Sequence, residues 1–244
     1  MLSGLQSQSL AQIFDADGVL VSEADRAHYG QDWSRFIAPD PSAIVFPKEV
    51  SQLKALVAFA RAEQIGLVPS GGRTGLSGGA TAARGEVVVS FERMNRVVDF
   101  DEAARLVLVE PGVITQQLQQ FAMDQGLYYP VDFASSGSSH IGGNIATNAG
   151  GIKVLRYGLT REWVGGLEVV TGNGHHLSLN HGLVKNATGI DQRHLFVGSE
   201  GILGFTSAAW MKLTEAPQPL RVMLLAVPSM RIALSVLSVC QGHL

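Results

Sequence analysis

A glycine-rich segment at residues 70–79 carries the residue types that hold phosphate groups. It contains five glycines together with the hydroxyl side chains of Thr74 and Ser77. Glycine lets successive backbone N–H groups converge on an anion, because no Cβ blocks a close approach. The segment therefore predicts a cradle for a phosphate or pyrophosphate. A purely structural turn is the alternative interpretation when this segment is considered alone.

A second segment of the same kind favours the ligand over the turn. Residues 135–151 interleave glycines with serines and add the amide and hydroxyl groups of Asn144, Thr147 and Asn148. A third glycine-rich segment, residues 198–204, adds a carboxylate as a hydrogen-bond acceptor. Phosphoryl transfer would need carboxylates that hold magnesium, and the sequence shows no such cluster. Three glycine-rich segments therefore indicate a large phosphate-bearing cofactor that spans them.

Common phosphate-binding motifs do not account for these segments. The sequence contains neither GxxxxGK[ST] nor GxGxxG, which excludes the P-loop and the Rossmann fingerprint. Residues 14–20, FDADGVL, resemble the aspartate-nucleophile motif of haloacid-dehalogenase-type phosphatases. That function would require an apolar strand before Asp15 and a later GDxxxD pair for a metal ion. Residues 8–13 are half polar and no GDxxxD occurs, so a turn is favoured and no metal site is predicted.

The elements that must position these segments alternate between strands and helices. A strand at 43–46, a helix at 48–64 and a strand at 65–69 form a βαβ unit that ends in the first glycine-rich segment. Residues 130–152 are expected to form a functional loop. The remaining elements are predicted as strands at 87–91, 97–100, 106–110, 166–171, 176–179, 203–213 and 221–226, and as helices at 113–125, 191–197 and 229–240.

Composition narrows the class of protein. The chain has 244 residues, a net charge of −3 and one cysteine, Cys240. A lone cysteine excludes a disulfide framework, and the slightly acidic balance gives no support to nucleic-acid binding. No apolar run is long enough for a membrane span, and residues 1–10 lack the pattern of a signal peptide. We therefore expect a cytoplasmic protein with neither a transmembrane segment nor a nucleic-acid partner; peripheral attachment to a membrane stays open.

Four motifs follow one another in an order that resembles one flavoprotein family. They are PSGGRTGLSGG, PVDFASSGSSHIGGNIATNAGG, LRYG and KNATGIDQRHLFVGSEGILG, and the similarity runs from about Asp32 to about Pro217. The arrangement resembles the vanillyl-alcohol-oxidase superfamily. Within it, the arrangement is most similar to the FAD-linked 2-hydroxyacid dehydrogenases that act on D-lactate, glycolate or D-2-hydroxyglutarate. The resemblance implies an α+β fold, an FAD-binding domain of the PCMH type whose two subdomains hold an extended FAD between them.

The resemblance also implies domain boundaries. Residues 1–38 are expected to form an N-terminal leader. Residues 39–217 are expected to form the FAD-binding domain, with subdomains at about 39–110 and 111–217. Residues 218–244 are expected to begin a cap domain that is truncated, so that the cap itself is absent.

The resemblance further implies which residues bind FAD. They are Ser70, Gly71, Gly72, Arg73, Thr74, Gly75 and Leu76 as a pyrophosphate grip; Asp132, Ser138, Gly142, Gly143, Asn144, Thr147, Asn148 and Gly150 on the pyrophosphate and isoalloxazine side; and Glu200, Gly201, Gly204 and Phe205 near the adenosine and the ring edge. In covalent members of the resembled family, a histidine of the first segment bonds the flavin. Residues 69–79 contain no histidine, so the resemblance implies non-covalent FAD.

Three residues of these segments need separate interpretation. Arg73 stands where the family often has glycine or asparagine, and we expect it to pair with a phosphate charge. Phe205 replaces a usual smaller aliphatic residue, and we expect it to crowd the cofactor. For His140, a donor to the phosphate or flavin and a structural contact within the loop are equally supported.

Oxidation of a hydroxy acid also needs a base for the hydroxyl proton and a cation for the carboxylate. The resembled dehydrogenases take these groups mostly from a cap domain and from a C-terminal segment with a histidine-rich motif. No HxGDGNxH-like cluster occurs here, so no catalytic residue is assigned. Two interpretations stay open. One is an FAD-linked oxidoreductase of 2-hydroxy acids that needs a missing segment and an unidentified electron acceptor. The other is a non-enzymatic FAD-binding fragment.

Overall fold

The first part of the chain builds a four-stranded sheet in the order β1-β2-β4-β3. The computed structural model describes residues 2–15, 17–219 and 222–241. Strands β2, β4 and β3 run parallel, and β1 pairs antiparallel with β2. The strands are β1 (Val19–Leu20), β2 (Ala43–Val45), β3 (Leu67–Ser70) and β4 (Val87–Ser90). The predicted βαβ unit is therefore present, with β2 and β3 on either side of β4.

Helix α3 (Val50–Ala62) makes this crossover because its apolar residues recur at helical spacing. Leu53, Leu56 and Val57 belong to the hydrophobic core that the helix forms with the sheet. Helix α1 (Gly4–Ile13) packs on α3 and buries Leu10 completely in the same core. Residues of the predicted leader therefore share a hydrophobic core with the first sheet, which α2 (Glu23–Tyr29) also contacts.

The second part of the chain builds an antiparallel five-stranded sheet in the order β5-β6-β10-β8-β9. Its central strand β10 alternates between buried and less buried residues, which is the pattern of a strand with one face on a core. Helices α4 (Thr115–Asp124) and α5 (Ile141–Thr147) contribute to that core. The strands are β5 (Val97–Asp101), β6 (Leu106–Val109), β8 (Val164–Thr171), β9 (His176–Leu179) and β10 (Gly204–Lys212).

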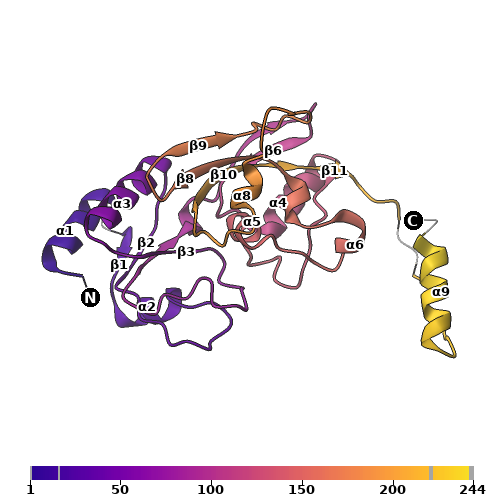
Figure 1. Cartoon of the computed structure of the whole chain (residues 1–244), viewed down its shortest axis with the longest axis horizontal. Coiled ribbons are helices and arrows are strands. Elements are labelled where there is room, and N and C mark those ends of the chain that lie inside the picture. The colour runs from indigo at the N-terminus through magenta and orange to yellow at the C-terminus, as the bar shows by residue number, and fades with distance from the viewer. Residues whose placement is uncertain (1, 16, 220–221, 242–244) are drawn as a thin grey trace.

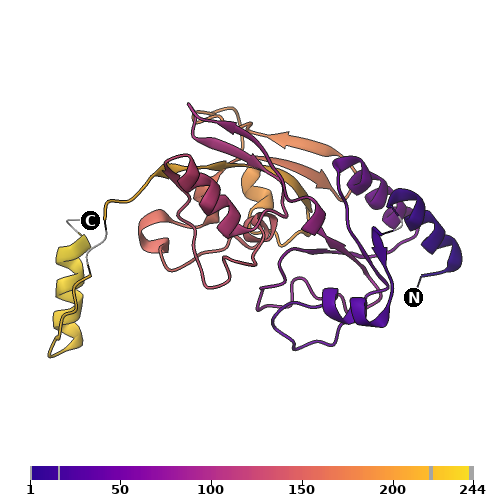
Figure 2. The ribbon, with the colours of Figure 1, turned by 180° about the vertical axis from the view of Figure 1, so that it is seen from behind.

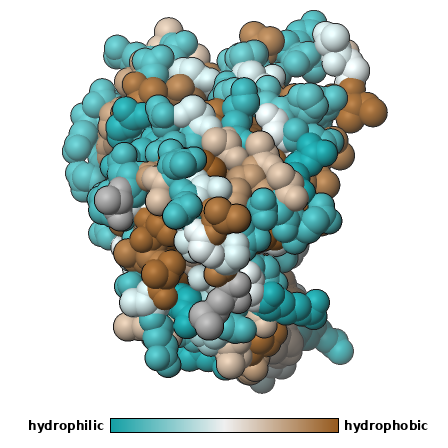
Figure 3. Space-filling model, turned by 90° about the vertical axis from the view of Figure 1, so that its left-hand side faces the viewer, coloured by the Kyte–Doolittle hydropathy of each residue, from teal (hydrophilic) through white to brown (hydrophobic). Residues whose placement is uncertain are grey.

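Smaller elements complete the described chain. They are the 3₁₀ turn Phe91–Arg93, the paired strands β7 (Leu127–Tyr128) and β11 (Thr214–Glu215), and the helices α6 (Val154–Tyr157), α7 (Thr160–Trp163), α8 (Arg193–Phe196) and α9 (Met230–Gln241). Figures 1 and 2 show α9 standing apart from the two sheets, and none of its described residues is buried. Figure 3 looks onto the opposite end of the molecule, where separate apolar patches interrupt a hydrophilic surface.

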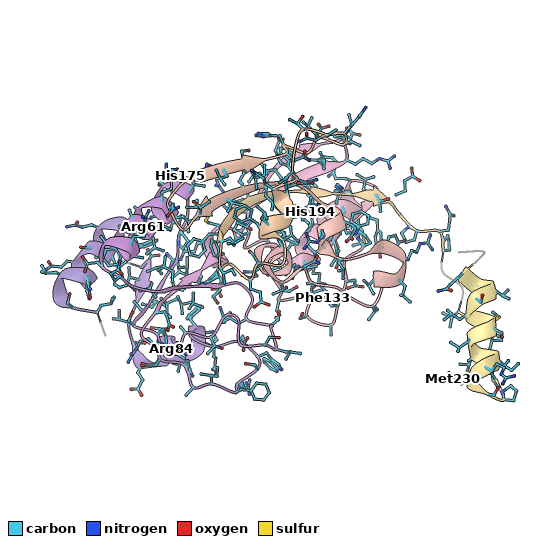
Figure 4. The ribbon with its side chains drawn as sticks, viewed as in Figure 1. Arg61, Arg84, Phe133, His175, His194 and Met230 are labelled. Carbon is cyan, nitrogen blue, oxygen red and sulfur yellow. The ribbon has the colours of Figure 1, made fainter. Side chains whose placement is uncertain are left out.

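The two sheets are joined by side chains of the second that reach into the core of the first. Val170 of β8 and Phe205 of β10 belong to the hydrophobic cluster built by α1, α3 and the first sheet. At the outer end of this junction, the Arg61 guanidinium of α3 donates to the Asn173 carbonyl in the β8–β9 turn at 3.3 Å. Figure 4 shows Arg61 beside His175 of the same turn.

Two predicted elements are corrected by the structure. The segment 130–152 is not all loop, because Ile141 and Ile145 bury one face of the short helix α5. The strand predicted at 221–226 does not form over residues 222–226; Arg221 lies outside the described residues. Val222 and Leu224 are both 97% exposed, and without a neighbouring strand an apolar run cannot complete its backbone hydrogen bonds.

Candidate cofactor-binding cleft

A cleft of about 560 Å³ runs between the two sheets, and all three glycine-rich segments line it. Phe133, labelled in Figure 4, also lines the cleft and packs against the core of the second sheet. The structure therefore brings together segments that are more than a hundred residues apart. The predicted residues that line the cleft are Ser70, Gly71, Gly72, Arg73, Thr74, Gly75, Leu76, Gly142, Gly143, Asn144, Thr147, Asn148, Gly150, Glu200, Gly201, Gly204 and Phe205.

Two predicted residues, Asp132 and Ser138, do not line the cleft. The Asp132 carboxylate accepts a hydrogen bond from Lys153 Nζ at 2.9 Å, and its carbonyl packs against Gly151. The Ser138 side chain is exposed, whereas its carbonyl faces Gly72 of the first segment. Both residues thus help to fix the shape of the loops. A sequence motif by itself does not distinguish this role from contact with a ligand.

Residues outside the first glycine-rich segment hold it in place, and most of its own backbone N–H groups are not used for this. It begins at the end of β3, and the buried Asp32 carboxylate accepts the Gly78 N–H at 2.7 Å. The Trp33 N–H donates to the Gly75 carbonyl at 2.9 Å. The N–H groups of residues 71–77 have no acceptor among the residues that the structure describes. A run of unpaired backbone donors beside a cleft is the arrangement that binds phosphate oxygens.

Glycine is required at two points where the segments touch. An added Cβ at Gly72 would lie 1.9 Å from the Ser138 carbonyl oxygen, which is far inside van der Waals contact. An added Cβ at Gly201 would lie 2.4 Å from Pro69 Cγ, and Gly201 also has a φ of +81°. Side chains at these positions would push the three segments apart, so the glycines set the width of the cleft.

The second and third segments are tied to each other through α5. The N–H groups of Gly198 and Glu200 donate to the carbonyls of Ile145 and Ala146 at 3.0 and 2.8 Å. The Asn144 side-chain amide donates to the Thr115 hydroxyl at 2.7 Å. The Asn144 side-chain nitrogen therefore braces the cleft wall, and the predicted contact of Asn144 with a ligand stays a prediction.

Asn148 and Thr147 are engaged in a similar way. The Asn148 side-chain oxygen accepts the Arg161 N–H at 3.0 Å, and Asn148 ends α5 with a φ of 48°. The Thr147 hydroxyl donates to the Gly143 carbonyl at 2.9 Å. Both residues line the cleft, but these polar atoms already have partners within the fold.

Arg73 and Phe205 each make contacts within the protein that could not be read from the sequence. The Arg73 guanidinium pairs with the Glu92 carboxylate at 2.7 Å and lies 4.5 Å from the Tyr29 ring centroid. Phe205 is 6% exposed and packs against Phe91 with ring centroids 5.8 Å apart. Arg73 thus has a protein partner for one of its guanidinium nitrogens, and its pairing with a phosphate stays a prediction. Phe205 fills the junction between the sheets as well as lining the cleft.

His140 is a cleft-lining residue outside the predicted set. It is 7% exposed, and its Nδ1 has no partner among the described residues; the same holds for the hydroxyl of Ser70. Burial lowers the pKa of His140; Glu92 acts against this shift, and Arg73 adds to it. The feature of the sequence that could have placed His140 at the cleft is its position directly before the Ile-Gly-Gly-Asn run of the second segment.

Because His140 is buried, we expect the folded chain to become less stable as the pH falls. Its pKa is lowered in the folded chain, whereas an unfolded histidine titrates near its ordinary value of about 6.5. Below that pH the unfolded chain takes up a proton that the folded chain resists, so stability decreases as the pH falls. We expect the urea midpoint to decrease between about pH 7.5 and about pH 5.5, and the decrease to be smaller in the His140→Leu variant. An unchanged pH dependence in that variant would contradict the assignment.

The phosphatase motif does not form a comparable site. Asp15 pairs with Lys48 at 2.5 Å, and Asp17 pairs with Arg93 at 2.9 Å, so each carboxylate faces its own cation. Neither aspartate lines the cleft. Within the described ranges, no group of three or more histidine, cysteine, aspartate or glutamate side chains is placed to hold a metal ion.

Comparison with known proteins identifies the class to which this fold and cleft belong. The chain matches the family described as FAD binding domain over residues 41–180, which is more than half of its length. It therefore belongs to that family, and the predicted vanillyl-alcohol-oxidase (PCMH) type is confirmed. A solved structure of alkyldihydroxyacetonephosphate synthase has a TM-score of 0.80 and covers 90% of this chain and 42% of that one. At 24% identity this likeness supports the fold alone.

Curated relatives are more similar in sequence. D-2-hydroxyglutarate dehydrogenase of Stutzerimonas stutzeri is 56% identical over 93% of this chain, and that of Xanthomonas citri pv. viticola is 51% identical over 97%. A glycolate oxidase subunit of Bacillus subtilis is 35% identical over 89% of the chain. The chain spans about half the length of these relatives: 49%, 50% and 46%. No helix in the described ranges is long and apolar enough to cross a membrane.

Proposed function

We propose that this chain is the cofactor-binding part of a flavin-dependent oxidoreductase that oxidises a 2-hydroxy acid, with D-2-hydroxyglutarate as the first candidate substrate. One observation carries the proposal: the glycine-lined cleft occurs in a chain that is 56% identical to a D-2-hydroxyglutarate dehydrogenase. The weaker similarity to a glycolate oxidase subunit makes glycolate the natural comparison substrate.

The residues of the cleft fit FAD in two respects. The N–H groups of residues 71–77, which have no acceptor among the described residues, suit the pyrophosphate. The buried Ser70 hydroxyl and His140 Nδ1 likewise have no hydrogen-bond partner in the described part of the chain. When bound, FAD would accept a hydride from the carbon that bears the substrate hydroxyl. The chain's own contribution is to bind and orient: Asp32 holds the first segment in place, and the Gly72 and Gly201 contacts set the spacing of the three segments. No histidine lies in the first segment, which supports non-covalent attachment.

The substrate-binding groups are proposed to come from another part of the full-length protein. Recognition of a hydroxy acid needs a cation for its carboxylate. Arg73 is the one cationic side chain among the described residues that line the cleft, and Glu92 already neutralises it. The additional length of the relatives leaves room for a segment that supplies the cation, the base and the contact with an electron acceptor.

The test begins with the absorption spectrum of the purified chain before and after incubation with FAD and desalting. We expect flavin bands to remain after desalting, and acid precipitation to release the flavin into the supernatant because it is not covalently attached. The protein extended to the length of its relatives is then reduced anaerobically with D-2-hydroxyglutarate, D-lactate or glycolate. Bleaching of the flavin by D-2-hydroxyglutarate in preference to the other two would support the substrate.

A different result would contradict each part of the proposal. A folded chain that retains no flavin would overturn the cofactor role. Retained flavin that no 2-hydroxy acid bleaches in the extended protein would leave an FAD-binding module and would overturn the oxidoreductase activity.

A further inference from the structure

Arg161 of α7 joins the second glycine-rich segment to the residues that lead into the third, although it does not itself line the cleft. Its backbone N–H donates to the side-chain oxygen of Asn148, which ends α5 and lines the cleft, at 3.0 Å. Its guanidinium donates to the Val197 carbonyl at 2.7 Å and meets His194 Nδ1 at 2.8 Å. One residue behind the cleft wall therefore fixes the end of one segment to the residue directly before another.

The bonds of the Arg161 side chain fix the path of the backbone. A guanidinium group has donors only, so His194 Nδ1 is the acceptor of the 2.8 Å contact. A longer bond of 3.4 Å reaches the His194 carbonyl. Within the described part of the chain, the acceptors of this side chain are thus an imidazole and two backbone carbonyls, with no carboxylate among them. The planar guanidinium presents several donors in fixed directions, whereas a lysine ammonium is a compact point charge on a flexible stem.

The residues that Arg161 holds are also anchored on their other side. His194 Nε2 lies 3.4 Å from the Asp191 carboxylate, and Arg193 pairs with the same carboxylate at 2.5 Å. The Arg193 guanidinium also donates to two carbonyls at the start of β8, at 2.7 and 2.8 Å. Helix α8 is thus fastened to the second sheet, and Arg161 supplies a side-chain link from this anchored helix to the second segment.

The third segment packs closely at this link. Gly198 has a φ of +85°, and an added Cβ there would lie 3.5 Å from Arg161 Nη2 and 3.5 Å from Asn148 Cβ. The N–H groups of Gly198 and Glu200 donate to carbonyls of α5 at 3.0 and 2.8 Å. These two bonds need the third segment at its present distance from α5, and Arg161 holds the carbonyl of the residue directly before them.

We propose that Arg161 is a positioning residue for the cofactor: it holds the third glycine-rich segment against the second and so keeps the cleft at the width that FAD needs. This inference rests on the proposed function, since an effect on affinity needs FAD in the cleft. In this role Arg161 acts through the Val197 backbone and the Asn148 side chain, and not by contact with the cofactor. Loss of its side chain should loosen the third segment in the free chain and weaken the binding of FAD.

The experiment compares the full chain with its Arg161→Met and Arg161→Lys variants. Methionine keeps a long apolar stem without a donor, and lysine keeps the charge without the fork of donors. Hydrogen exchange of the free chain is measured by mass spectrometry, and the Kd for FAD is measured from the change in flavin fluorescence. We expect Arg161→Met to exchange about tenfold faster at residues 198–200, to exchange as the wild type does in β4, and to bind FAD about tenfold more weakly. Arg161→Lys should recover part of both losses.

Arg84→Met is the matched control, because Arg84 is exposed before β4 and Figure 4 shows it well away from His194. It should leave the exchange and the Kd unchanged. An unchanged Kd in Arg161→Met would overturn the inference. So would exchange that is unchanged at residues 198–200, or that is faster to the same extent in both sheets, because the role of Arg161 would then be a general structural one. A wild-type chain that binds no FAD would contradict the proposed function and this inference together, whereas the other results contradict the inference alone.

Discussion

The Gly72→Ala variant is expected to lose most of its affinity for FAD. The new Cβ would lie 1.9 Å from the Ser138 carbonyl oxygen, so the first and second glycine-rich segments would have to separate by more than an ångström. Because the neighbour is backbone, no side chain can turn aside to relieve the contact. We expect the overpacking to cost about 3 kcal/mol. If the cofactor needs both segments at their present spacing, the Kd for FAD rises by about two orders of magnitude.

Gly143→Ala is the control for the steric part of this argument. Gly143 also lines the cleft, but no atom lies within 4 Å of an added Cβ there. Alanine is favoured over glycine inside a helix by about 1 kcal/mol, so α5 should be as stable or more stable in this variant. Urea unfolding of both free chains measures the stability difference, and a fluorescence titration measures the affinity. A Gly72→Ala chain that unfolds and binds FAD like the wild type would show that the segments do not need this contact.

The second large effect is expected at Phe205, where the two sheets meet. Phe205 belongs to the second sheet by sequence and to the core of the first sheet by packing, with Phe91 as an aromatic neighbour. Truncating a buried phenylalanine to alanine typically costs about 3–5 kcal/mol, because a cavity remains. We expect Phe205→Ala to lose stability in this range. For a chain of this length, that shifts the melting temperature by roughly 2–4 °C for each kcal/mol.

Two control variants distinguish the effect of a cavity between the two sheets from the effect of replacing any phenylalanine. Phe205→Leu keeps an apolar side chain and should cost only about 1 kcal/mol. Phe36→Ala removes a phenylalanine that is 86% exposed and should change stability by less than about 0.5 kcal/mol. If Phe205→Ala were no more destabilising than Phe36→Ala, the two sheets would have to be held together by other contacts.

Local patterns in the sequence were sufficient for most of the elements. The helix predicted at 48–64 appears as Val50–Ala62, and the strand predicted at 203–213 appears as Gly204–Lys212, because the spacing of apolar residues reports which side faces a core. The short helix α5 was missed, since the glycines and asparagine of its sequence also suit a loop. The strand predicted at 221–226 failed over 222–226 because a strand needs a neighbour, which no local pattern supplies.

The cleft itself was only partly determined by the sequence. The order of the four motifs was enough to predict the family, and the comparison confirms it. The predicted phosphate cradle could also be recognised in the sequence, because the glycines and hydroxyl groups that form one lie within a single segment. The partners of each side chain were decided by tertiary structure. Packing between segments distant in the chain decides that Arg73 pairs with Glu92 and that Gly72 lies against the Ser138 carbonyl. It also decides that His140 Nδ1 has no hydrogen-bond partner among the described residues. A sequence motif records which groups are present, whereas only the fold decides which of them still have a free hydrogen bond.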